Sequence, residues 1–154
     1  MNKEARDLEL AIKGEAIKER LEKLRSLDKE LAAAMEARAR ADEAQRAASE
    51  HEAVIRWQKA GSIARALGVA YDFAGVFSAW YLSGKEKFAG APQCTNYFMQ
   101  DGPPALRFTE KDRPAIIRWH QAKGAAQAAI IHWSALAESR ALLLREHPEL
   151  TYAA

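Results

Sequence analysis

Histidine and cysteine are the side chains of this chain with the most versatile chemistry, and their spacing does not favour a metal site. The 154 residues include four histidines and one cysteine. His120 and His132 are separated by twelve positions, which on one helix places them about 120° apart around the axis. They would therefore not share a metal ion. The chain has no HExxH motif and no pair of CxxC motifs, so the sequence predicts no bound metal.

Two further side chains are candidates for catalysis. Cys94 could act as a nucleophile together with His120, although a buried or capping cysteine is the more usual case. Asp72 could act as a catalytic carboxylate, but no second acidic residue lies near it in the sequence. The glycines between positions 61 and 75 match no phosphate-binding fingerprint. The sequence therefore predicts a protein that is not an enzyme and that needs no cofactor.

Composition divides the chain into two parts and limits its class. All aromatic residues lie after position 56 and all prolines after position 91, whereas the first 56 residues are rich in charge. The formal net charge of +2 gives no overall signal for nucleic-acid binding. A single cysteine excludes an internal disulfide, and no signal peptide is expected, because the N-terminus is charged and lacks an apolar run. We also expect no membrane partner. The single cysteine fits a reducing compartment, so we expect a cytoplasmic protein. The high alanine content favours a bacterial or phage origin, so the protein could also be a component of a bacterial or phage assembly.

Residues 1–48 are predicted to form a helical arm for oligomerisation or docking. Their large apolar residues recur at seven-residue spacing, with a second column four residues further on, as in a coiled-coil seam. The seam residues are Leu10, Ile17, Leu21, Leu24, Leu31 and Met35. The simplest expectation is a homodimer. The alternative is that the arm folds back on its own chain.

Residues 49–154 are predicted to form the helical core domain. A capping box at 49–52 marks a helix boundary, and the helical pattern then continues from 53 to about 87. Gly61, Gly68 and Gly75 recur every seven residues, which predicts close packing against another helix, because glycine lets two backbones approach. Arg65 and Asp72 flank this glycine line and could pair with each other or with a partner chain.

Proline and glycine forbid a long helix between residues 89 and 109, and a final helix is predicted from there to about residue 146. The long loop carries Tyr97, Phe98 and Met99. These three side chains either cover the open end of the core or form a partner-binding surface, since long loops are often functional.

The sequence as a whole predicts an all-α protein: a long coiled-coil-like N-terminal helix followed by a helical pair with a proline- and glycine-rich connecting loop. We expect it to act by association with itself and with another protein, as an adaptor, assembly component or inhibitor. The alternative is a nucleic-acid-binding protein that uses basic residues interleaved with aromatic ones around the start of the last helix. These basic candidates are Arg107, Lys111, Arg113, Arg118 and Lys123.

Overall fold

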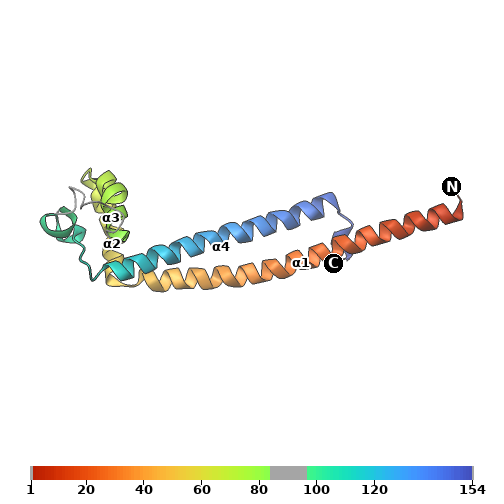
Figure 1. The fold of residues 1–154 in the computed structure, drawn as a ribbon, viewed down its shortest axis with the longest axis horizontal. Helices are drawn as coiled ribbons and strands as arrows, with labels where there is room; N and C mark the ends of the chain where they lie inside the picture. Colours follow the sequence, from red (N-terminus) through yellow and green to blue (C-terminus); the bar gives the residue numbers. More distant parts are fainter. Residues whose placement is uncertain (1, 84–96, 154) are drawn as a thin grey trace. The chain divides into compact units, whose positions relative to one another are not determined.

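The computed structural model describes residues 2–83 and 97–153, and these residues form helices and no strand, as Figure 1 shows. The predicted all-α class is confirmed. In chain order the elements are α1 (Lys3–Ser49), α2 (Glu52–Ala66), the π-helix η1 (Asp72–Phe77), α3 (Ser78–Leu82), the π-helix η2 (Tyr97–Asp101), the 3₁₀ helix η3 (Pro104–Leu106), α4 (Arg113–Glu146) and α5 (Leu150–Ala153). No helix in the described ranges is long and apolar enough to cross a membrane.

The chain divides into two compact units. The first unit consists of residues 1–40 and 127–154, and the second of residues 41–126. Both long helices, α1 and α4, contribute to each unit. These units differ from the predicted division into an arm of residues 1–48 and a core of residues 49–154. The physical reason is that the second half of α4 packs on the middle of α1.

The first unit is an antiparallel helix pair closed by α5. Leucines of α1 face leucines of α4 and α5, and the buried members of this cluster are Leu24, Leu27, Leu143 and Leu150. Ion pairs fix the direction: Arg20 lies 3.5 Å from Glu149, and Arg140 lies 2.5 Å from Asp28. Asp28 of α1 pairs with Arg140 of α4, and Arg38, further along α1, lies over the ring of Trp133, which comes earlier in α4, so the two helices run in opposite directions (Figure 1). These exposed pairs contribute little energy compared with the buried leucines.

The seven-residue column of α1 is only partly used within the chain. Leu24 is buried, and Leu21 and Leu31 are half-buried against the other helices of the unit. Leu10 and Met35 remain exposed, at 67% and 59% of their surface. The alternative that the arm folds back on its own chain therefore describes the middle of α1, whereas the first turns lie outside this packing.

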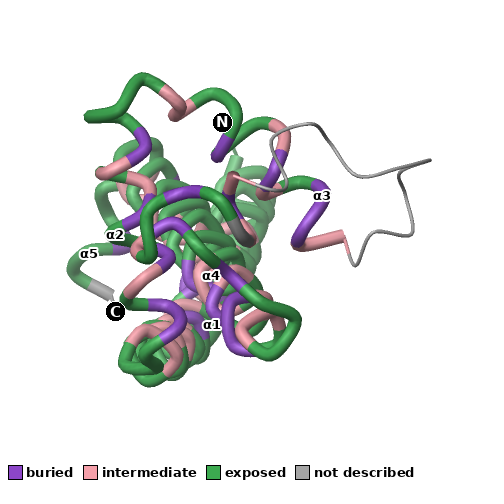
Figure 2. Tube along the Cα trace, turned by 90° about the vertical axis from the view of Figure 1, so that its left-hand side faces the viewer, coloured by how far each residue is buried: buried purple, intermediate pink, exposed green. Residues whose placement is uncertain are grey.

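The second unit is built around an aromatic cluster. Figure 2 shows the buried positions of α2 and α3 in purple, and most of the buried aromatic side chains of the chain belong to this cluster. Ring centroids lie 4.9 Å apart for Trp57 and Phe73 and again for Phe77 and Phe98. Trp57, on α2, contacts rings from η1, α3 and the segment before α4, so it links the elements of this unit.

The predicted helix from residue 53 to residue 87 is wrong, because the chain turns after α2. Gly68 has a φ angle of +76°, a left-handed conformation that glycine adopts without the strain other residues would suffer. The chain then becomes helical again and forms the π-helix η1, whose turns are wider than those of an α-helix. At the end of η1, the Ser78 hydroxyl donates to the carbonyl of Phe73 at 2.5 Å. Residues 84–87 lie outside the described ranges.

The predicted boundary between the first two helices is confirmed, but its cap is a different residue. The ring nitrogen Nδ1 of His51 accepts a hydrogen bond from the backbone N–H of Ala53 at 3.1 Å and caps α2. Ser49 instead donates its hydroxyl to the carbonyl of Arg46, within α1. The predicted end of the long C-terminal helix near residue 146 is confirmed, since α4 ends at Glu146, but the short helix α5 after it was not predicted.

Candidate functional site

A cavity of about 620 Å³ opens in the second unit between α2, the η1–α3 segment and α4. Its size is within the usual range for small-molecule sites, roughly 300–1,000 Å³. The described residues that line it are Trp57, Gln58, Gly61, Arg65, Ala70, Phe73, Ala74, Ser78, Ala79, Leu82 and His120. Its walls are mainly apolar, and its described lining contains one formal cation and no acidic residue.

Small residues are the reason that this cavity is not filled. Gly61 and three alanines stand where α2 faces the η1–α3 segment. A Cβ atom added at Gly61 would meet no atom within 4 Å. No described segment of the chain therefore packs closely on this glycine, and space remains where a larger side chain would have stood.

The three glycines predicted to line one helix crossing have three separate roles, so close packing is not what the described residues show. Gly61 borders the cavity, and Gly68 turns the chain. At Gly75 an added Cβ atom would lie 3.6 Å from the ring of Tyr71, one turn earlier in the same segment. The seven-residue spacing is real, but the turn at Gly68 removes the shared helical face that the prediction assumed.

Trp57 and His120 form the best-defined polar contact of the cavity. The indole Nε1–H of Trp57 donates to Nε2 of His120 at 3.1 Å. Because indole is only a donor, Nε2 must carry its lone pair, which places the proton of the neutral ring on Nδ1. Burial, and secondly the charge of Lys123, lower the pKa of His120. The ring is therefore held in its neutral form at neutral pH.

The polar edge of the cavity carries a positive charge without a matching carboxylate. Arg65 is exposed, and its Nε–H reaches the carbonyl of Gly61 only at 3.4 Å. Among the described residues the structure gives Arg65 no acidic partner. The hydroxyl of Ser78 is already directed to the backbone of η1. This arrangement suits binding of a polar or anionic group better than nucleophilic attack on one.

The other catalytic candidates do not join this site within the described ranges. Asp72 is exposed at the first position of η1 and does not line the cavity. Cys94 lies outside the described residues. No group of three or more His, Cys, Asp or Glu side chains that could hold a metal ion occurs in the part of the chain that the structure describes.

At residues 97–99 the structure places Phe98 in the core rather than on a partner surface. Phe98 is fully buried, and its ring centroid lies 5.2 Å from that of Phe73. Its carbonyl accepts a hydrogen bond from the backbone N–H of Phe108 at 2.9 Å, which ties two parts of the loop together. Tyr97 and Met99 are half-buried against the same cluster. The loop residues therefore cover the open end of the core.

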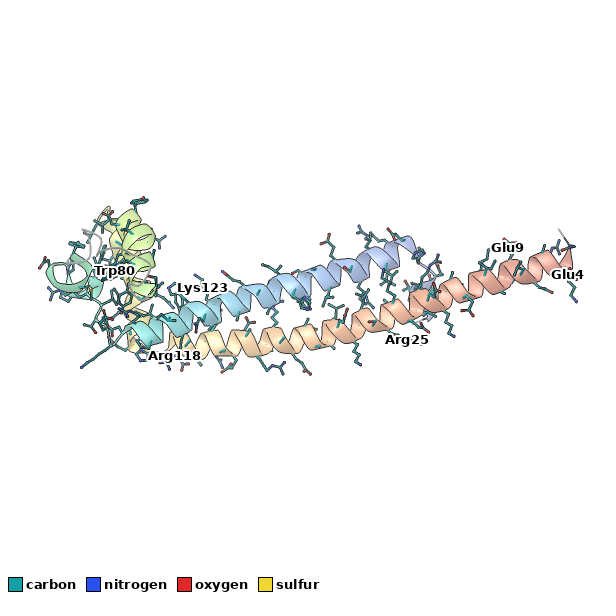
Figure 3. All side chains as sticks on the ribbon, in the orientation of Figure 1. Glu4, Glu9, Arg25, Trp80, Arg118 and Lys123 are labelled. Carbon is teal, nitrogen blue, oxygen red and sulfur yellow. The ribbon has the colours of Figure 1, made fainter. Side chains whose placement is uncertain are left out.

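Three of the five basic candidates are already engaged by neighbouring groups. Lys123 stands 5.2 Å from the centre of the Trp119 ring, and Arg113 stands 5.3 Å from the centre of the Tyr81 ring. Arg107 donates its Nε–H to the carbonyl of Gly102 at 2.7 Å. The remaining two, Lys111 and Arg118, are exposed. Figure 3 labels Arg118 and Lys123 near the start of α4.

Sequence reasoning did not single out Arg56, which joins the start of α2 to the start of α4. Its guanidinium lies 2.5 Å from Glu52 and 2.8 Å from Asp112, and it donates to the carbonyl of Arg107 at 2.9 Å. Hydrogen bonding to Glu52, followed by the charge of Asp112, raises the pKa of Arg56 against the opposing effect of burial. This network ties the segment before α4 to the start of α2.

A second candidate surface lies at the N-terminal end of α1, in the first unit. We call residues 3–19 the exposed arm. Its four large apolar side chains, Leu8, Leu10, Ile12 and Ile17, are exposed to 64%, 67%, 61% and 37%. Glu4 and Glu9, labelled in Figure 3, belong to the same turns, where no other segment of the first unit runs alongside. The ion pair nearest the N-terminus that joins α1 to another element of this unit is that of Arg20 with Glu149.

The contact between Trp57 and His120 was also missed by sequence reasoning. These residues are 63 positions apart, and the sequence alone does not indicate which donor the histidine would meet.

No protein-family model, no curated protein and no solved structure matches this chain.

Proposed function

We propose that this protein is not an enzyme and acts by protein–protein association, with the exposed arm of α1 as the contact surface. The observation that supports the proposal is the exposure of four large apolar side chains within residues 3–19. Full burial of one such side chain stabilises a complex by roughly 1.5–3 kcal/mol. Leu10 and Ile17, seven residues apart, share one face of this charged helix, as is typical of a helix that packs on a partner, whereas Leu8 and Ile12 share the opposite face.

A second copy of the chain is the simplest partner. Two-fold association uses one self-complementary surface on each copy, so no additional surface is required. The arm carries both signs of charge in close alternation, including the ion pair between Glu9 and Lys13 at 3.1 Å. Two antiparallel arms could therefore bury their apolar side chains without placing a block of like charge together.

The biological role that fits this mode of action is that of an adaptor, an assembly component or an inhibitor. A bacterial or phage origin and a cytoplasmic location are part of the same proposal, and they rest on composition alone. Another protein is the expected second partner, bound either by the arm or by the surface that the dimer forms.

The proposal is tested by the molecular mass in solution, measured by light scattering over a range of concentrations. Leu10 and Ile17 are changed together to Asp, because both are exposed and belong to the predicted seam. Leu24 and Leu31 are unsuitable targets, since they are buried or half-buried within the first unit and their loss would unfold it.

The expected result is a dimer for the wild type and a monomer for the double variant, with unchanged helix content. Ala39→Asp is the matched control, because Ala39 is exposed on the same helix outside the arm. This control should remain dimeric. A wild-type protein that stays monomeric at high micromolar concentration would remove self-association from the proposal.

A further inference from the structure

We propose that the cavity of the second unit binds a small organic anion with an apolar body, such as a medium-chain or aromatic carboxylate. This inference goes beyond the association described above, because it concerns a different unit and does not depend on the exposed arm. It rests on the shape of the cavity, on its lining and on the charges around it.

The walls determine the apolar part of the ligand. Trp57 and Phe73 supply aromatic surface, and Leu82 with three alanines supplies aliphatic surface. The side chains that would ordinarily fill such a space are absent, because the facing positions carry glycine or alanine. An apolar group of a ligand that enters the cavity fills the space beside these small residues and is thereby removed from water.

The charges determine the polar part of the ligand. Arg65 lines the cavity and has no carboxylate partner among the described residues. Lys123 lies close enough to His120 to act on its protonation. No acidic side chain belongs to the described lining. The electrostatic potential at this edge is therefore positive, and an anionic head group can pair with the guanidinium.

The contact between Trp57 and His120 gives the site a defined wall. It fixes both rings and leaves His120 neutral, so the histidine adds no charge of its own. The adjoining π-helix η1 contributes Phe73 and Ala74 to the lining. π-helical turns are uncommon and often occur at functional sites.

The experiment compares octanoate with octan-1-ol, which share an apolar chain but differ in head-group charge. Titration calorimetry should show one octanoate bound per chain, with a dissociation constant on the order of 0.1–1 mM. Octan-1-ol should bind about fivefold more weakly, as expected for the loss of a partly exposed charge pair. Arg65→Gln should weaken octanoate binding by the same factor and leave octan-1-ol binding unchanged.

Filling the cavity separates ligand binding from folding. Gly61→Leu places a side chain in the open space and also improves helix propensity, so it should abolish binding of both compounds and raise the melting temperature. Ser62→Leu adds the same side chain at the next, exposed position and should bind octanoate as the wild type does. Ala79→Leu fills the cavity from the opposite wall and serves if Gly61→Leu does not fold.

An internal reporter locates the ligand. In a nitrogen–proton correlation spectrum the indole signal of Trp57 should move on addition of octanoate, whereas that of Trp133, in the first unit, should not. Three results would overturn the inference: no binding of either compound at millimolar concentration, unchanged binding by folded Gly61→Leu, or equal binding of the acid and the alcohol by the wild type. The arm proposal is unaffected by any of them, because its readout is the molecular mass without ligand.

Discussion

At the scale of single residues, the contact between Trp57 and His120 shows how a neighbour fixes the state of a titratable ring. The indole can only donate, so the imidazole must accept through Nε2 at 3.1 Å. Protonation of His120 would place a second donor against the indole N–H. Burial, and secondly the charge of Lys123, lower the pKa of His120, and the contact with the indole disfavours the protonated ring as well.

We therefore predict that acid weakens the fold through His120. The unfolded chain, with an ordinary pKa of about 6.5, binds the proton more readily than the folded chain does. The contribution of neutral His120 to stability is complete above that value, and it is lost as the pH falls from 6.5 through the lower folded-state pKa. Urea unfolding at pH 7.5 and at pH 5 should show a drop in the free energy of unfolding for the wild type.

His120→Gln should reduce that drop, because glutamine stays neutral and its side-chain oxygen can still accept from the indole. His132→Gln removes a histidine from the exposed surface of α4 and should keep the wild-type response. An equal drop in the wild type and in His120→Gln would show that other groups carry the acid sensitivity.

At the scale of elements, the spacing of apolar residues identified the helix of the leucine column, but it did not show which other elements would bury that column. The leucine column correctly marked α1 as a helix with an apolar side, and α1 ends at Ser49, one residue from the predicted end. The sequence did not show that α4 covers the middle of this column while the first turns stay exposed. That outcome depends on the length of α4 and on where α5 begins, which are tertiary features.

For the line of Gly61, Gly68 and Gly75, the spacing predicted a shared helical face that the structure does not have. A repeat of seven residues indicates a shared face only while the helix continues, and Gly68 ends it with a positive φ angle. A glycine inside a helical pattern can allow close helix packing, turn the chain or leave a space unfilled, and the sequence alone does not distinguish these three cases. The cavity and its contact between Trp57 and His120 were unpredictable for the same reason, since both depend on how the chain turns after α2.

We predict opposite effects of alanine at two of these glycines. Gly68→Ala should lower the free energy of unfolding by about 1 kcal/mol, because alanine is strained in the left-handed region. Gly61→Ala should raise it by about 0.5–1 kcal/mol, since the position is helical and unobstructed. Chemical unfolding of the two variants beside the wild type measures both changes, and effects of the same sign would contradict the separate roles assigned here.

At the scale of the whole molecule, the exposed arm and the compact part of the first unit differ in how they are packed. The leucines that hold this unit together begin near Leu21, whereas the exposed apolar side chains of Leu8, Leu10 and Ile12 precede it. The leucine cluster that holds the first unit together therefore does not include the apolar side chains of the arm.

We predict that removal of residues 2–15 leaves the fold intact and removes self-association. The melting temperature of the wild type should rise with protein concentration, because association stabilises the folded chain by mass action. That of the shortened protein should be independent of concentration, while circular dichroism shows the same helicity per residue in the rest of the chain. A concentration dependence that survives the truncation would place the interface outside the arm.

The π-helical turns of η1 give the second unit a segment in which the number of residues can change. A π-helix holds one more residue than an α-helix of the same length would require. Deletion of Gly75, an exposed residue of η1, would let the segment relax to an α-helix, and the residues after it would keep their direction. Trp80 and Tyr81 would therefore stay in the aromatic core. The same deletion in a regular α-helix such as α2 would turn the residues after it by about 100° around the helix axis.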